Sequence, residues 1–405
     1  MKENNNKKKW IKFRHRIARN LIYAALYHYS KIKYGITVER FREQEDHPYL
    51  ILYNHQTSFD QFFVGMAFRG PVYYLASEDI FSLGFISSVI KYLVAPIPIK
   101  KQTTDVKAIL NCIRVAKEGG TIAIAPEGNR TFSGKTEYIN PAIIPLIRKL
   151  ALPIALYRIE GGYGVQPRWS DVKRRGKMRA FVSRVIPFDE YKDMSDEELT
   201  AAVNEGLAVD EAVADAEFHH KRLAEYLERA IYVCPDCGLS TFESNYDIIE
   251  CKKCGKKVRY LPTKELCGIG FDLPFQFVND WYEYQKTYVN SLDLDELGNE
   301  PLYTEKASVS EVIVYKNKKL LHKSADVLLY RDKLVLKADG EVYEFPFSDT
   351  SAITVLGKNK LNIYHNKMVY QLKSDKRFNA LKYVNLFNRY KNIAKGEKDG
   401  EFLGL

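Results

Sequence analysis

Long hydrophobic runs are missing from this sequence of 405 residues. No segment approaches the ~18 consecutive apolar residues of a membrane-spanning helix. The segment from Asn4 to Lys9 leads into a heavily charged stretch, which does not fit a cleavable signal peptide. We therefore expect a cytoplasmic protein, either free or peripheral on the cytosolic face of a membrane. Because 46% of its residues are hydrophobic, the chain can bury a large core divided over two or three domains.

Cysteine is also scarce, and its spacing argues against disulfide bonds. Four of the six cysteines form two CxxC pairs, a pattern that favours metal binding in a cytosolic chain. A glycine follows each pair and permits the left-handed turn of a metal knuckle, and the 13 residues between the pairs suit one β-hairpin. A redox dithiol is the weaker alternative, since it would need only one pair. We expect a zinc ribbon with one structural zinc ion, bound by Cys234, Cys237, Cys251 and Cys254.

Acidic residues are outnumbered by basic ones, which gives the chain a net charge of +10. This surplus is compatible with anionic lipid, nucleic acid or phosphorylated substrates, and it does not choose among them. The segment from Trp10 to Tyr34 interleaves apolar and basic residues and has aromatic ends, which predicts a basic amphipathic helix. This helix either packs on the domain beside a solvated basic tail or lies on an anionic membrane surface, and the two roles can coexist.

An apolar run at residues 50–52 predicts the end of a buried strand, and two polar candidates follow it. They are His55 and, five positions later, Asp60. If the chain turns helical with Thr57 or Ser58 as the cap, one turn brings the Asp60 carboxylate back to the imidazole. Such a pair is the base with an orienting carboxylate that general base catalysis on a hydroxyl requires. The alternative is a surface histidine beside an unrelated aspartate.

A second β-rich run, from Thr121 to Ala125, ends abruptly in the sequence PEGNR. Together the two stretches resemble the glycerolipid acyltransferases typified by lysophosphatidic acid acyltransferase. The motifs NHxxxxD and EGTRS of that family are matched here by Asn54, His55 and Asp60 and by Glu127, Gly128 and Arg130. Asn129 stands where the family usually has threonine, and Thr131 where it usually has serine.

The resemblance implies an enzyme of phospholipid synthesis. It implies transfer of a fatty acyl group from acyl-CoA or acyl carrier protein to the hydroxyl of a lysophospholipid, with 1-acylglycerol-3-phosphate as the expected acceptor. In that reaction His55 takes the proton of the acceptor hydroxyl, and Asp60 orients the imidazole.

The resemblance also assigns expected substrate contacts. Arg130, aided by Lys100 or Lys101, is expected to hold the acceptor phosphate, and Glu127 and Gly128 are expected to shape the pocket. The family's second motif carries an arginine where this chain offers Lys100 and Lys101, each of which is a compact charge without the planar fork of a guanidinium. A structural ion pair between Glu127 and Arg130 is the alternative interpretation of those two residues.

The order of patterns along the chain predicts its domains. Alternating strands and helices predict an α/β fold with an acyltransferase-type mixed sheet flanked by helices. Residues 195–232 are predicted to be mainly helical, opening with a capping box. Short strands after residue 310 and a final helix resemble the small β-barrel of pleckstrin-homology-like domains. The predicted segments are a membrane-surface helix at 1–34, an acyltransferase domain at 35–230, the zinc ribbon at 231–262, a connecting segment at 263–305 and a β-rich domain at 306–405.

Two other functions compete with the enzyme. One is a non-catalytic lipid-binding scaffold that retains the acyltransferase fold, although an inactive relative would tend to lose His55 or Asp60. The other is a basic zinc protein that binds nucleic acid through the lysines of the ribbon. Because zinc ribbons mostly act as structural staples, we do not expect nucleic acid as the partner.

Overall fold

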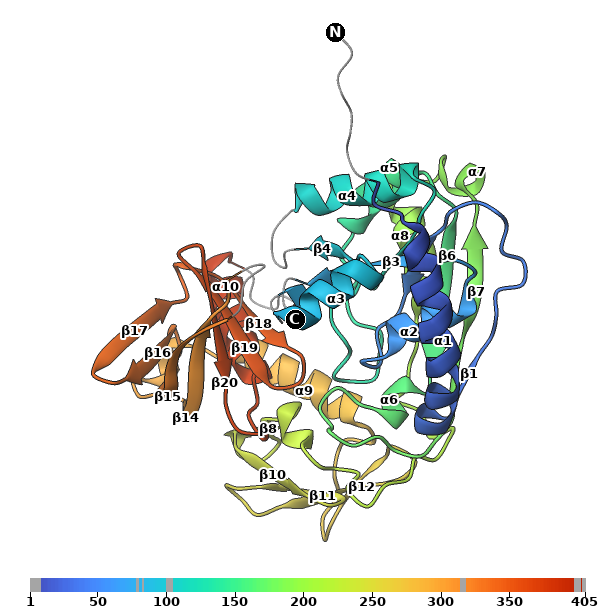
Figure 1. Ribbon diagram of the computed structural model, residues 1–405. Helices are drawn as coiled ribbons and strands as arrows, with labels where there is room; N and C mark the ends of the chain where they lie inside the picture. Colours follow the sequence, from blue (N-terminus) through green and yellow to red (C-terminus); the bar gives the residue numbers. More distant parts are fainter. Residues whose placement is uncertain are drawn as a thin grey trace. The chain divides into compact units, whose positions relative to one another are not determined.

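The computed structural model describes residues 9–77, 80–81, 84–99, 105–313, 318–396 and 402. The chain forms two compact units, and Figure 1 labels helices and strands of both. The first unit comprises Met1–Gly128, Ile139–Glu160 and Met178–Val209, and the second comprises Asn129–Tyr138, Gly161–Lys177 and Asp210–Leu405. These units divide the chain differently from the five predicted segments, because two short pieces of the predicted acyltransferase domain, 129–138 and 161–177, and its last stretch, 210–230, group with the C-terminal half.

The predicted mixed sheet forms the centre of the first unit, and it has seven strands. Its order is β1-β7-β6-β2-β5-β3-β4, and only the pairing of β6 with β7 is antiparallel among the described strands. The strands are β1 (Ile36–Val38), β2 (Leu50–Tyr53), β3 (Val72–Ser77), β4 (Ile97–Ile99), β5 (Thr121–Ile124), β6 (Ile154–Glu160) and β7 (Met178–Ile186).

Strands β2 and β5 are buried along their whole length, which explains why their sequences read as continuous apolar runs. They lie side by side and parallel, with Leu50 opposite Ile122 and Leu52 opposite Ile124. Their carboxyl ends therefore meet at the same edge of the sheet. The two sequence motifs follow these strand ends directly, so the register brings the motifs together.

Helices cover both faces of this sheet (Figure 1). Leu50 and Leu52 pack on one face in a core shared with α4, α5 and α8. On the other face, the hydroxyl of Tyr157 donates to the carbonyl of Phe63 in α2, at 3.0 Å. The helices of the first unit are α1 (Phe13–Tyr34), α2 (Asp60–Ala67), α3 (Phe85–Leu93), α4 (Val106–Lys117), α5 (Ile143–Leu150), α7 (Phe188–Tyr191) and α8 (Asp196–Leu207).

Helix α1 packs on α2 and α3, which confirms the prediction that it packs on the domain. The close approach to α2 occurs at Gly65, where an added Cβ would lie 1.9 Å from the hydroxyl of Tyr23. The buried residues of α1 are His15, Ala18, Ser30 and Tyr34. Among the described residues, no helix combines the length and the apolar character that crossing a bilayer requires.

The helix predicted for residues 195–232 is much shorter than expected. Ser195 and Glu198 form the predicted capping box, but α8 ends at Leu207. The chain then enters the second unit, where Glu211 is buried, forms an ion pair with Lys264 at 3.3 Å and accepts from the backbone of Gly161. These tertiary contacts replace the helical pairing that the local pattern favoured.

A small antiparallel sheet surrounds the two CxxC pairs in the second unit. Its order is β10-β11-β12-β13, and β10 and β11 form the predicted hairpin between the pairs. The last strand lies in the segment predicted as a connector, so this sheet extends beyond residue 262. The strands of this sheet are β10 (Phe242–Asn245), β11 (Ile248–Cys251), β12 (Lys257–Tyr260) and β13 (Leu266–Gly268), and β8 (Val233–Cys234) and β9 (Gly238–Leu239) form a separate two-stranded sheet.

Seven antiparallel strands and a terminal helix complete the second unit, consistent with the predicted β-rich fold. Helix α10 (Leu381–Ala394) packs on β18 and on α9 (Val278–Ser291). The pleckstrin-homology-like assignment stays a prediction. The strands, in the order β17-β16-β15-β14-β20-β19-β18, are β14 (Tyr303–Glu311), β15 (Lys319–Leu329), β16 (Lys333–Ala338), β17 (Glu341–Pro346), β18 (Thr350–Leu356), β19 (Lys360–His365) and β20 (Met368–Lys373).

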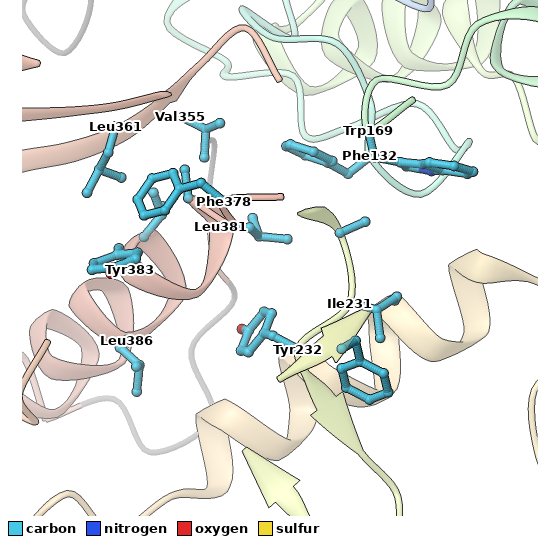
Figure 2. Packing of buried hydrophobic residues seen from close by; sticks show 14 of the residues in the cluster. Phe132, Trp169, Ile231, Tyr232, Val355, Leu361, Phe378, Leu381, Tyr383 and Leu386 are labelled. Atoms are coloured by element: carbon cyan, nitrogen blue, oxygen red, sulfur yellow. The ribbon is translucent and has the colours of Figure 1, made fainter. Parts of the chain in front are cut away.

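One continuous hydrophobic core holds the second unit together. Figure 2 shows Phe132 and Trp169, from the two short pieces, in the same cluster as Ile231 and Tyr232. Val355, Phe378 and residues of α10 belong to it as well. Phe132 and Trp169 are fully buried there, which explains why those pieces group with the C-terminal half of the chain.

Candidate active site

The imidazole of His55 and the carboxylate of Asp60 are in direct contact, as the spacing predicted. The distance from His55 Nδ1 to Asp60 Oδ2 is 2.8 Å. The Asp60 side chain is fully buried, whereas 23% of the His55 side chain remains exposed. A carboxylate accepts the proton on Nδ1, so the imidazole tautomer that fits this contact has its lone pair on Nε2. The pair thus has the geometry of a general base with its orienting carboxylate.

Asp60 is held in place by a set of donors from its own loop. Its two carboxylate oxygens accept backbone N–H groups of Gln56 at 2.7 Å and of Thr57 at 2.9 and 3.0 Å. The hydroxyl of Thr57 also donates to it, at 2.6 Å. Several donors to one buried carboxylate satisfy its oxygens and fix its orientation. The carboxylate that orients His55 is therefore held in place without any basic residue among these donors.

The local turn differs from the predicted one in its cap. The expected caps were Thr57 and Ser58, but α2 begins at Asp60 after Phe59, which makes no side-chain cap. Asp60 itself occupies the first turn and accepts the backbone N–H groups that precede the helix. Its negative charge at the helix N-terminus is favourable because of the helix dipole. The different start of the helix does not affect the predicted contact with His55, since the turn still brings the carboxylate back to the imidazole.

Two neighbouring side chains anchor the loop that carries His55. Asn54 is buried and exchanges two hydrogen bonds with the backbone of Ile159, at 2.7 and 2.9 Å, which extends the pairing of β2 with β6. The carboxylate of Glu127 accepts the backbone N–H of His55 at 2.7 Å. Glu127 therefore ties the loop after β5 to the loop after β2, a contact that the sequence reasoning missed.

The structure describes only some of the other residues that are predicted to contact substrate. Gly128 has φ of +70°, a left-handed conformation that favours glycine, in the turn that follows β5. Arg130 lies three residues after Glu127 and belongs to the second unit. Lys100 and Lys101 lie outside the described residues. The substrate roles of these residues, and of Glu127, remain predictions.

Arg168 is a further residue that the sequence reasoning did not single out. Its guanidinium is buried in the second unit and donates to the carbonyl of Arg130 at 2.7 Å. It also donates to the carbonyls of Gly357 at 2.8 Å and Val355 at 3.2 Å. Arg168 thereby links the main chain at Arg130 to the turn between β18 and β19. Because these partners lie 38 to 189 positions away in sequence, no motif could have indicated the contact.

The four cysteines of the CxxC pairs converge on one point. Their sulfur atoms all lie within 4.8 Å of one another, and those of Cys234 and Cys254 are 3.8 Å apart. A zinc ion with four thiolates at ~2.3 Å keeps its sulfurs ~3.8 Å apart, so the arrangement fits a tetrahedral metal ion. Gly238 and Gly255 have φ of +67° and +74°, which is the left-handed turn predicted for each knuckle.

Comparison with known proteins supports an acyltransferase domain in the first half of the chain. Residues 35–157 match the model of the family described as Acyltransferase, and this range contains His55, Asp60 and Glu127. Among solved structures, the chain is similar to the 1-acyl-sn-glycerophosphate (LPA) acyltransferase PlsC of Thermotoga maritima. The identity is 20% over 48% of this chain and 80% of that chain, with a TM-score of 0.40. No curated protein is similar enough to the chain to match it.

Proposed function

We propose that this protein transfers a fatty acyl group from a thioester donor, acyl-CoA or acyl carrier protein, to the hydroxyl of a lysophospholipid. The expected acceptor is 1-acylglycerol-3-phosphate, as the sequence resemblance implied. The observation that carries the proposal is the 2.8 Å contact of His55 with a buried, multiply hydrogen-bonded Asp60, inside the segment that matches the acyltransferase family. The non-catalytic scaffold fits less well, because it has no need for a base with an orienting carboxylate.

The proposed reaction uses His55 as the base and Asp60 as the carboxylate that orients it. Nε2 of His55 takes the proton of the acceptor hydroxyl as the oxygen attacks the thioester carbonyl carbon. The resulting tetrahedral intermediate collapses when the carbon–sulfur bond breaks, and the thiolate leaves with the proton returned by His55. Asp60 stabilises the imidazolium between these steps and stays ionised. The products are the new ester and the free thiol of the donor.

We propose that Arg130 binds the acceptor phosphate. A guanidinium carries a permanent charge and a planar fork that matches phosphate oxygens. Losing one charge-assisted hydrogen bond of this kind costs about 1.5–3 kcal/mol. Arg130→Ala should therefore raise the KM for the acceptor roughly 10- to 100-fold and leave the KM for the acyl donor nearly unchanged. Steady-state kinetics with each substrate varied in turn measures both values.

Arg175→Ala is the matched control for this prediction, since Arg175 is an exposed arginine of the same unit. The control should leave both KM values unchanged. If Arg130 instead shapes its loop through an ion pair, Arg130→Ala would impair donor and acceptor alike and lower the melting temperature. That result would assign Arg130 to the scaffold.

We also propose that α1 holds the enzyme on anionic membranes with its outward face. Phe13, Leu21 and Ile32 are 77%, 70% and 79% exposed, although the same helix packs on α2 and α3. Placing such side chains in a lipid interface removes apolar surface from water. Lys31 and Lys33 in the last turn supply charges that anionic headgroups attract.

Replacing Phe13, Leu21 and Ile32 by glutamine should weaken binding to anionic vesicles at least roughly tenfold, since each buried apolar side chain contributes about 1.5–3 kcal/mol. Sedimentation with phosphatidylglycerol vesicles measures the change. The control replaces three exposed apolar residues of the second unit by glutamine: Tyr246, Leu320 and Val342. Equal binding by the two triple variants would leave α1 with its packing role alone.

A further inference from the structure

A basic cavity lies in the first unit, beside α1 and the C-terminal end of α2. Its volume is about 700 Å³. Arg19, Tyr23 and His28 line it from α1, and the chain after β1 and the end of α2 form the rest of its wall. Among its lining residues are four arginines and a histidine, and no aspartate or glutamate. The arginines are Arg19, Arg40, Arg42 and Arg69.

The backbone around this cavity is fixed by hydrogen bonds. The N–H of Phe41 donates to the carbonyl of Ala67 at 3.0 Å. The buried side chain of Gln44 accepts from the N–H of Arg69 at 2.6 Å and donates to the carbonyl of Arg69 at 3.1 Å. These contacts hold the segment that carries Arg40 and Arg42 against the end of α2. The cavity is thus a built feature of the fold, and its arginines start from fixed main-chain positions.

Three of the four arginines of this cavity have no acidic partner among the described residues. Within the part of the chain that the structure describes, Arg40, Arg42 and Arg69 form no salt bridge. Other arginines of the same unit do form salt bridges. These pairs are Arg114 with Glu118, Arg148 with Asp196, Arg158 with Glu160, Arg179 with Glu39 and Arg184 with Glu190. A concave wall with one sign of charge focuses its field on the space that it encloses, which attracts an anion.

Arg19 is partly buried, whereas the other three arginines are exposed, and its hydrogen-bonding groups are only partly satisfied. Its Nη2 donates to the carbonyls of Gly65, at 3.2 Å, and Phe68, at the C-terminal end of α2. Its Nε is buried and has no acceptor among the described residues. Burial lowers the pKa of Arg19, and the charge of Arg40 lowers it further. A bound anion would therefore give Nε of Arg19 an acceptor, and it would reduce the repulsion between Arg19 and Arg40.

We propose that this cavity binds a phosphate group, and that it is a site separate from the catalytic pair. Arginine forks and a neighbouring histidine are the donors that phosphate oxygens prefer. The cavity lies at the end of α2 opposite Asp60, which is ~10 Å away along the helix at 1.5 Å per residue. The phosphate belongs either to a lipid headgroup, reached from the outward face of α1 at Ala24 and Tyr27, or to a free soluble phosphate.

The experiment compares two double variants that remove the same charge. Arg40→Gln/Arg42→Gln removes two arginines of the cavity, and Lys107→Gln/Lys117→Gln removes two exposed lysines of α4 that do not line it. Each full-length protein is titrated with inorganic phosphate by calorimetry. Each is also sedimented with phosphatidic acid vesicles and with phosphatidylserine vesicles of equal surface charge.

The cavity variant should lose roughly 10- to 100-fold in affinity for its phosphate ligand, as expected for one or two charge-assisted hydrogen bonds. The lysine variant should lose much less. Selective retention on phosphatidic acid vesicles, with no response to inorganic phosphate, identifies a lipid headgroup as the ligand; a saturable response to inorganic phosphate identifies a soluble phosphate. Equal losses in both double variants, or binding of the wild type to neither probe, would overturn the proposal.

The result does not depend on the proposed acyl transfer. The same titrations with the His55→Ala protein should give wild-type affinities, because His55 is not among the lining residues. A protein that binds phosphate through the cavity but transfers no acyl group would refute the proposed activity and leave the phosphate site standing.

Discussion

His55→Ala is expected to lower the rate of acyl transfer roughly 10²- to 10⁴-fold, the range that a general base contributes. The loss should fall on kcat, because the imidazole acts on the proton that moves in the transition state. The partly exposed side chain contributes little to the core, so the melting temperature should stay close to that of the wild type. Single-turnover assays with acyl-CoA and 1-acylglycerol-3-phosphate, alongside thermal unfolding, measure both effects.

Asp60→Asn is the companion variant. Asparagine keeps the size of the side chain but removes the charge that stabilises the imidazolium, so activity should fall as much as in His55→Ala or less. The double variant should be no slower than His55→Ala alone, since Asp60 acts through His55. Full turnover by a well-folded His55→Ala protein would exclude the mechanism.

Removal of the metal is expected to have the second large effect. We propose that the four clustered cysteines hold one structural zinc ion per chain, and structural zinc contributes on the order of 10 kcal/mol to the folding of small zinc domains. Cys234 and Cys251 belong to the core of the second unit together with Trp281 and Tyr260. Cys234→Ser should therefore destabilise the strands β8 to β13 and the core residues packed on them.

The control for this prediction is Cys267→Ser, which replaces an exposed cysteine outside the cluster. Elemental analysis should find one zinc per chain in the wild type and in the control. Hydrogen exchange should show early opening of the second unit in Cys234→Ser, with much smaller changes around His55. Absence of zinc from the wild type, together with freely reactive thiols, would refute the metal site.

The sequence by itself determined the features that depend on local spacing. The apolar runs of β2 and β5 predicted strands, and that of β2 a buried one, because a strand covered on both faces has no polar side. A spacing of five positions from His55 to Asp60 sufficed for the contact, since one turn closes that distance. The two CxxC pairs with their glycines predicted the cysteine cluster for the same reason.

Only the tertiary structure decided the contacts between residues far apart in sequence. Glu127 reaches the backbone of His55 because β2 and β5 are neighbours in the sheet, an order that no local pattern states. Arg168 meets Arg130, and Arg19 shares a cavity with Arg69, for reasons of the same kind. The helix predicted after residue 195 ended early because Glu211 gained a buried partner in Lys264. Spacing constrains what one turn or one hairpin can bring together, whereas strand order and core packing determine everything that lies further apart.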